Sequence, residues 1–260
     1  MSESQGLATV RYAVRRDADA WELPEVPVPE SYEHDQLSER LVALLKAWRE
    51  RTQLDALVTR NLAVRWVPQN AKVGVDPDVA LVVPAPPLDE GLSSLCLWLP
   101  GHAAPRLAIE VVSKRHPYKD YRDIHEKYAA SGIGELWILD PLGHGPKALG
   151  GPVPIQQWIR CDEAFDRVHF GSGPVYSEAI DAWLWSNPVR ISDDRDGMNP
   201  WLTVSEMERA AKDAALARED AERREKEVAL EREETQRARA VAAEARIAEL
   251  ERRLGSKGGG

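Results

Sequence analysis

The chain of 260 residues has only two cysteines, Cys96 and Cys161, and neither lies near a cluster of histidines in the sequence. A disulfide scaffold or a zinc site is therefore not expected, and both thiols should be reduced. No run of about 18 uncharged apolar residues occurs, and residues 1–16 lack the apolar stretch of a secretion signal. These absences predict a soluble, cytoplasmic protein that does not enter a membrane.

Positive charge is also scarce, because 34 basic residues stand against 43 acidic ones and the formal net charge is -9. Non-specific binding of nucleic acid depends on Lys and Arg that neutralise phosphates. The composition therefore argues against a general nucleic-acid coat, and a DNA substrate would need divalent cations or a local basic patch. The clear basic cluster near the acidic residues discussed below is Lys114, Arg115, Lys119 and Arg122.

Proline and glycine are absent from residues 203–254, where Ala, Glu and Arg dominate. This segment is expected to form one long charged helix or a weak coiled coil. Ile247, Leu250 and Leu254 have the spacing of a coiled-coil turn, but no heptad register is sustained before them. The helix offers a surface for a homodimer or a partner protein, and residues 255–260 are expected to be a flexible tail.

The rest of the chain divides by composition into three further segments. Residues 1–29 carry several prolines among acidic residues, which predicts an extended arm that lies on the surface or is disordered. Residues 30–190 are expected to form one α/β domain, and residues 191–202 a linker.

Within this domain, the periodicity of apolar residues predicts an alternation of helices and strands. Leu37, Leu41, Leu44, Leu45 and Trp48 indicate an amphipathic helix over 33–49. A hairpin (56–59 and 62–67) should lead into a strand at 78–83, followed by a proline-rich loop at 84–105. The remaining expected elements are strands at 107–112 and 136–139, a helix at 118–131, an antiparallel extension at 155–160 and 167–170, and a short closing helix at 179–185. This order predicts an α/β layer fold with a mixed sheet.

Glu110 lies inside the apolar run Leu-Ala-Ile-Glu-Val-Val, where an unpaired carboxylate would be costly to bury. Period-two alternation puts Glu110 on the same face of the strand as Ala108 and Val112. A purely structural explanation for Glu110 is a salt bridge or a position at an exposed strand end. The alternative is that Glu110 belongs to a functional site.

Asp78 follows Pro77 at the entry to the apolar run 79–83, and taken alone it would be a turn residue, a role for which Asp76 competes. Together with Glu110, however, two carboxylates on adjacent strands would form an oxygen site suited to Mg2+ or Mn2+. Such an ion can lower the pKa of a bound water and stabilise charge on a phosphate.

The helix predicted at 118–131 adds polar residues to this region. Asp120 and Lys127 are seven residues apart, so on a regular α-helix they lie within about 20° of each other around the axis. A lysine at the margin of a buried stripe can orient water or neutralise a phosphate oxygen. It can equally extend into solvent.

Longer strings of residues resemble one known family. They are Pro77-Asp78, Ile109-Glu110-Val111-Val112-Ser113, Lys119-Asp120-Tyr121 and the fifteen residues from Lys127 to Pro141. Over residues 32–186 the chain resembles the Uma-two family of restriction endonucleases, a branch of the PD-(D/E)XK nuclease superfamily. The resemblance implies a restriction-endonuclease-like α/β core with a mixed central sheet flanked by helices. It also implies a magnesium-dependent endonuclease that acts on DNA.

By this resemblance Asp78 and Glu110 are metal ligands, and the carbonyl of Val111 is a third. The superfamily's lysine normally lies two residues after the Glu, where this chain has Val112. The resemblance therefore makes Lys127 the candidate for this role. Lys114 and Lys119 are its rivals, and the supporting residues are Asp120, Lys119, Ser113 and, on the first helix, Glu33 or His34.

Three functions follow from these residues. The first is hydrolysis of DNA by metal-activated water with Mg2+ or Mn2+ as the cofactor. The second, favoured by the acidic core and the displaced lysine, is a catalytically inactive nuclease-like module that binds a partner protein through the C-terminal helix. In the third, Asp78 and Glu110 belong only to a structural ion pair.

Overall fold

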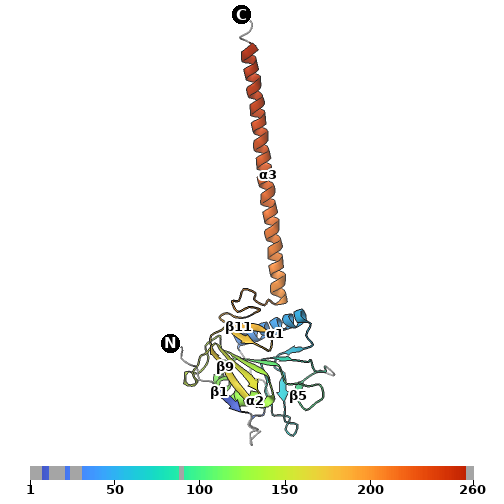
Figure 1. Cartoon of the computed structure of the whole chain (residues 1–260), viewed down its shortest axis with the longest axis vertical. Helices are drawn as coiled ribbons and strands as arrows, with labels where there is room; N and C mark the ends of the chain where they lie inside the picture. The colour runs from blue at the N-terminus through green and yellow to red at the C-terminus, as the bar shows by residue number, and fades with distance from the viewer. Residues whose placement is uncertain (1–7, 12–20, 24–30, 88–90, 256–260) are drawn as a thin grey trace. The chain divides into compact units, whose positions relative to one another are not determined.

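The computed structural model describes residues 8–11, 21–23, 31–87 and 91–255, with side chains up to residue 249. Contacts divide the chain into two compact units, Met1–Val204 and Ser205–Gly260. The first unit is an α/β domain and the second is one helix (Figure 1).

A seven-stranded sheet forms the centre of the first unit, with the order β1-β9-β8-β7-β6-β4-β2. Its strands are β1 (Ala8–Arg11), β2 (Leu57–Thr59), β4 (Val79–Val82), β6 (Leu107–Val111), β7 (Glu135–Leu139), β8 (Ile155–Cys161) and β9 (Ala164–Gly171). Strands β6 and β7 are parallel and the other neighbours are antiparallel. The mixed central sheet predicted from the order of elements is thus confirmed.

Two smaller sheets differ from the expectations. Strand β3 (Ala63–Arg65) pairs in parallel with β5 (Ser94–Cys96), while β2 pairs with β4, so the predicted hairpin of β2 and β3 is wrong. The fully buried strand β4 offers β2 a better partner than its immediate neighbour in the sequence. Strand β5 also lies inside the segment that was expected to be a loop.

The predicted closing helix at 179–185 is also wrong. Residues Ala182–Ser186 form β11, the middle strand of a sheet with β10 (Val175–Ser177) and β12 (Val189–Ser192). Ala182 and Leu184 face the core, while Trp183 and Trp185 alternate to the other side. The apolar residues of this segment fit both a helical spacing and the two-residue alternation of a strand. The structure shows the alternation of a strand.

Helices cover both faces of the seven-stranded sheet. Helix α1 (Tyr32–Thr52) begins at Ser31, whose side chain accepts a hydrogen bond from the His34 backbone N–H. On the other face, a π-helical turn η2 (Lys119–Asp123) continues into α2 (Ile124–Ser131). Helix α2 ends at Gly132 with φ 82°, a left-handed conformation that favours glycine. A 3-10 turn, η3 (Lys147–Leu149), follows β7.

The alternation along β6 separates two apolar cores. Leu107, Ile109 and Val111 pack with α1 and with the sheet of β10, β11 and β12. Ala108 and Val112 pack on the opposite face with residues of α2, β8 and β9. Glu110 shares the parity of Ala108 and Val112, so its carboxylate is directed to the side of η2 and α2.

Two segments at the edges of the domain contribute buried residues. Within residues 1–29, β1 pairs with β9, and Trp21 is buried beside Trp66. The rest of that arm lies outside the described residues. Within residues 191–202, Trp201 is buried and stacks on Trp48 with ring centroids 5.8 Å apart.

The second unit is helix α3 (Val204–Gly255). Nearly all of its described side chains are exposed, and three ion pairs at i,i+3 or i,i+4 lie along it. Such pairs stabilise an exposed helix modestly. The expected flexible tail falls almost entirely on residues 256–260, which lie outside the described residues. Among the described residues, no helix is both long and apolar enough to cross a membrane.

Candidate active site

Asp78 lies at the start of β4 and is fixed by two donors. Its Oδ2 accepts a hydrogen bond from the Val111 backbone N–H at 2.7 Å and lies 3.0 Å from His34 Nε2. The first contact ties Asp78 to the end of β6, one residue after Glu110. The second ties it to the first turn of α1.

The carbonyl of Val111 faces the same neighbour as its N–H. In an antiparallel ladder the N–H and C=O of one residue point to the same adjacent strand. The Val111 N–H points to Asp78, whereas the Val112 N–H donates to Leu139 of β7. The Val111 carbonyl is therefore directed toward the side on which Asp78 lies.

Glu110 is almost completely buried, with 2% of its surface exposed. Its Oε2 lies 3.2 Å from Lys119 Nζ, and its Oε1 accepts a short hydrogen bond from the Tyr128 hydroxyl. Tyr128 comes from α2 and is itself fully buried. Both carboxylate oxygens are thus held by groups of the helical layer.

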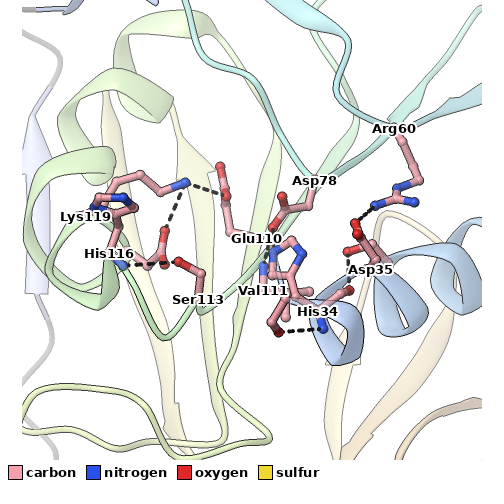
Figure 2. A network of polar contacts seen from close by, with 12 residues as sticks. His34, Asp35, Arg60, Asp78, Glu110, Val111, Ser113, His116 and Lys119 are labelled. Atoms are coloured by element: carbon pink, nitrogen blue, oxygen red, sulfur yellow. Dashed lines mark hydrogen bonds and ion pairs between the residues drawn. The ribbon is translucent and has the colours of Figure 1, made fainter. Parts of the chain in front are cut away.

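Lys119 bridges two carboxylates (Figure 2). Its Nζ lies 3.2 Å from Glu110 Oε2 and 3.3 Å from Asp120 Oδ1. The Lys119 side chain is 47% exposed, whereas those of Glu110 and Asp120 are 3% and 1% exposed. Lys119 is therefore the member of this group that a ligand can reach from solvent.

Asp120 is buried, and Lys119 is its charged partner, with Lys119 Nζ 3.3 Å from Asp120 Oδ1. The backbone of Ser113 also favours the ionised form of Asp120. A buried carboxylate is unfavourable unless such partners compensate it. Asp120 thus depends on Lys119 and on the loop after β6.

Burial raises the pKa of Glu110 to about 8; Asp78 and Asp120 add to this rise, and Lys119 opposes it. Burial also raises the pKa of Asp120 to about 7, against the effect of Lys119. For Lys119 itself, burial lowers the pKa, but Glu110, Asp120 and Asp78 outweigh it and the net direction is upward. One lysine thus faces three carboxyl groups, and the raised pKa values of Glu110 and Asp120 mean that the buried site disfavours the ionisation of all three at once.

A second network holds the π turn that carries Lys119 and Asp120. The Tyr121 hydroxyl donates to Asp140 Oδ2 at 2.9 Å and accepts from the Val153 N–H at 2.8 Å. The Asp140 carboxylate also accepts from the backbone N–H groups of His144 and Gly145. The turn is therefore fixed from the end of β7.

The other residues predicted for the site lie around this group. Ser113 accepts a hydrogen bond from the His116 N–H in the loop after β6. Glu33 is exposed, and its neighbour His34 makes the contact with Asp78. Lys114 is exposed in the same loop as Ser113.

Lys127 is half-buried on α2, and its place in the chemistry stays a prediction. The assumption of a regular α-helix between Asp120 and Lys127 is wrong, because η2 is a π turn. A π turn holds more residues than an α turn, so it rotates later side chains relative to earlier ones. Lys119 is a lysine whose Nζ contacts Glu110.

Tyr128 and Asp140 were not predicted as site residues, whereas His34 was named as the alternative to Glu33 and makes the contact with Asp78. Tyr128 belongs to the apolar stripe of its helix, which hides the need of its hydroxyl for a partner. The available signal for Tyr128 was the buried Glu110 on the preceding strand. For Asp140, the sequence offers no comparable indication.

The donor chemistry of this site fits a hard divalent cation. Mg2+ binds few carboxylates and keeps several waters, and Asp78, Glu110 and the Val111 carbonyl supply oxygen donors of that kind. A cation bound here would also offset the cost of ionising the buried Glu110 and Asp120. Within the described ranges, no group of three or more His, Cys, Asp or Glu side chains is placed to hold a metal ion.

Residues 22–147 match the model of a family described as "Putative restriction endonuclease", and the match spans α1 to β7. The match is to the Uma2 family and covers slightly less than half of the chain. It agrees with the resemblance seen in the sequence.

One similar solved structure is a crystal structure described as that of a putative nuclease belonging to DUF820 from Anabaena variabilis. The similarity covers 59% of this chain and 76% of that chain, with 15% sequence identity and a TM-score of 0.41. A comparison with curated proteins gave no match.

Proposed function

We propose that this protein is an endonuclease that hydrolyses phosphodiester bonds of DNA with Mg2+ or Mn2+ as its cofactor. The observation that carries the proposal is the contact of Lys119 with both Glu110 and Asp120. The match of residues 22–147 to the Uma2 family model supports the same conclusion.

Asp78, Glu110 and the Val111 carbonyl would hold the divalent ion. When bound, the ion supplies Lewis-acid stabilisation of charge on the phosphate and makes water more acidic near neutral pH. The Val111 N–H and His34 orient Asp78, and Tyr128 orients Glu110. These contacts fix the carboxylates before a substrate arrives, which is the arrangement that catalysis requires.

Lys119 would stabilise negative charge that develops on the phosphate. Its ammonium group is partly exposed, and its charged state is favoured by Glu110 and Asp120. A preoriented cation at a site of developing charge is worth about 10²–10³ in rate. Asp120 holds the ammonium from the buried side.

The test is nicking of supercoiled plasmid by purified protein with Mg2+ or Mn2+. Asp78→Asn and Glu110→Gln should abolish nicking, whereas Glu163→Gln, an exposed acid on the turn between β8 and β9, should leave it unchanged. Binding of Mn2+ should also raise the melting temperature of the wild type, because a ligand of the folded state stabilises it. An inert wild type, or variants that nick equally well, would contradict the proposal.

A second candidate function is binding of a partner or a second copy through α3. It is supported by the large apolar side chains that α3 exposes, Leu216, Leu230 and Ile247 among them. A dimer of wild type in sedimentation equilibrium, converted to monomer by Leu230→Glu with Ile247→Glu, is the expected result for self-association. A wild-type monomer at high concentration would rule out the homodimer.

A further inference from the structure

The loop between β6 and η2 combines exposed positive charge with an exposed aromatic ring. We call residues 113–118 the basic loop. Lys114, Arg115 and His116 are exposed in it, and Tyr118 exposes 50% of its surface. Basic residues interleaved with an aromatic residue are typical of surfaces that bind single-stranded nucleic acid.

The basic loop leads directly into the candidate active site (Figure 2). The His116 N–H donates to Ser113 Oγ at 3.3 Å, and the Lys119 N–H donates to the His116 carbonyl at 3.1 Å. Tyr118 immediately precedes Lys119. A nucleic-acid strand that lies along the basic loop would therefore reach Lys119 next.

The cations near the site are not equivalent. Arg122 is engaged by Asp123, with Nε 2.6 Å from Oδ1. Lys114 forms no ion pair within the part of the chain that the structure describes. Lys114 can therefore neutralise a phosphate without first giving up a carboxylate partner among the described residues.

The net negative charge of the protein favours single-stranded DNA over duplex DNA as its ligand. Duplex DNA carries one negative charge per ~1.7 Å of helix axis, and the chain has a net charge of -9 with one short basic loop beside the site. A single strand carries fewer charges per unit length and can bend. It can follow the basic loop to Lys119, whose side chain is 47% exposed, while bringing less phosphate against the acidic protein.

We propose that the basic loop binds single-stranded DNA, with Tyr118 stacked on a base and Lys114 on a phosphate. This inference rests on the proposed function and names the form of DNA that the same site takes. The loop delivers the strand to Lys119, so a phosphodiester bond one or two nucleotides from the stacked base reaches the site.

Binding is measured by fluorescence anisotropy with a labelled oligodeoxythymidylate in EDTA, so that no strand is cut. Tyr118→Ala should weaken binding by about fivefold or more, while Tyr118→Phe, which keeps the ring, should stay close to wild type. Lys114→Ala should reduce the slope of log affinity against log salt by about 0.7, the value for one phosphate contact on a single strand. The control is Lys46→Ala, an exposed lysine on α1, which should change neither affinity nor slope.

Two outcomes would overturn this inference. One is a duplex of the same length that binds more tightly than the single strand. The other is an unchanged affinity of Tyr118→Ala. The failures are distinguishable, because a protein that binds the single strand through Tyr118 but cuts no DNA contradicts only the proposed function. A protein that nicks plasmid but is indifferent to Tyr118→Ala contradicts only the role of the basic loop.

Discussion

Lys119 Nζ lies 3.2 Å from Glu110 Oε2, although Lys119 belongs to the helical layer and Glu110 to the middle of the sheet. Lys119 is the first residue of the π turn η2, and its Nζ also lies 3.3 Å from Oδ1 of the adjacent Asp120. The same ammonium group therefore links a carboxyl group of the sheet to one of the helical layer.

Whether Lys119 or Lys127 is the catalytic lysine can be tested with one substitution at each position. Lys119→Gln should lower the rate of plasmid nicking by about 100-fold, because a preoriented cation at the site is lost. Lys127→Gln, the matched change on α2, should lower it much less. Initial rates with Mg2+ at saturating DNA provide the measurement. The reverse order of the two variants would assign the role to Lys127.

Removal of the Tyr128 hydroxyl should destabilise the protein. Tyr128→Phe keeps the ring but leaves Glu110 Oε1 without its donor in a buried environment, which costs about 1–3 kcal/mol of the free energy of unfolding. Urea unfolding followed by tryptophan fluorescence measures the change. Tyr176→Phe, which removes a hydroxyl that contacts Asp181 at the surface, is the control and should have little effect. An equal effect of the two variants would contradict the role of Tyr128.

Much of the site could be predicted from the sequence because its residues interrupt clear patterns. Glu110 stands inside an apolar strand, and Asp78 precedes another. Strand alternation then gives the direction of Glu110 without knowledge of the fold. The expectation that Asp78 and Glu110 lie on adjacent strands follows from this reasoning, whereas Val111 was a candidate only through the family resemblance. The structure pairs β4 with β6, and the Val111 N–H donates to Asp78.

The remaining features depend on interactions that no local pattern encodes. The π turn at Lys119–Asp123 has the sequence of an ordinary helix, so the sequence could not give the position of Lys119 relative to Lys127. The strand Ala182–Ser186 has apolar spacing that suits a helix as well as a strand, and only its packing partners decide. The pairing of β3 with β5 likewise depends on a contact across the proline-rich segment.

Whether the segment 191–202 packs on the domain or is only a linker can be tested directly. Trp201 is 3% exposed, stacks on Trp48, and its Nε1 donates to Asp193 Oδ1 at 2.6 Å. Trp201→Ala should therefore lower the free energy of unfolding by about 3–5 kcal/mol. Leu202→Ala, at a more exposed neighbour, should have a far smaller effect in the same urea titration. A fully stable Trp201→Ala variant would show that this segment acts only as a connection.

His125 should make the protein sensitive to acid. Burial, reinforced by the positive charge of Arg167, lowers the pKa of His125 to about 4. The unfolded state, with its ordinary pKa near ~6.5, binds the proton more readily. This contribution to stability is therefore complete above about pH 6.5 and is lost as the pH falls toward about 4.

Between pH 7 and 5 the loss amounts to about 2 kcal/mol from this group. His125→Phe, which preserves an aromatic ring against Trp158 at the position of the stacked imidazole, removes the titration. Unfolding in urea at both pH values should show a smaller decrease in stability for the variant than for wild type. The raised pKa values of Glu110 and Asp120 change the stability with pH in the direction opposite to that of His125. Both proteins contain these two residues, so their contribution cancels in the comparison. An identical decrease in the two proteins would mean that His125 is not the group that responds to acid.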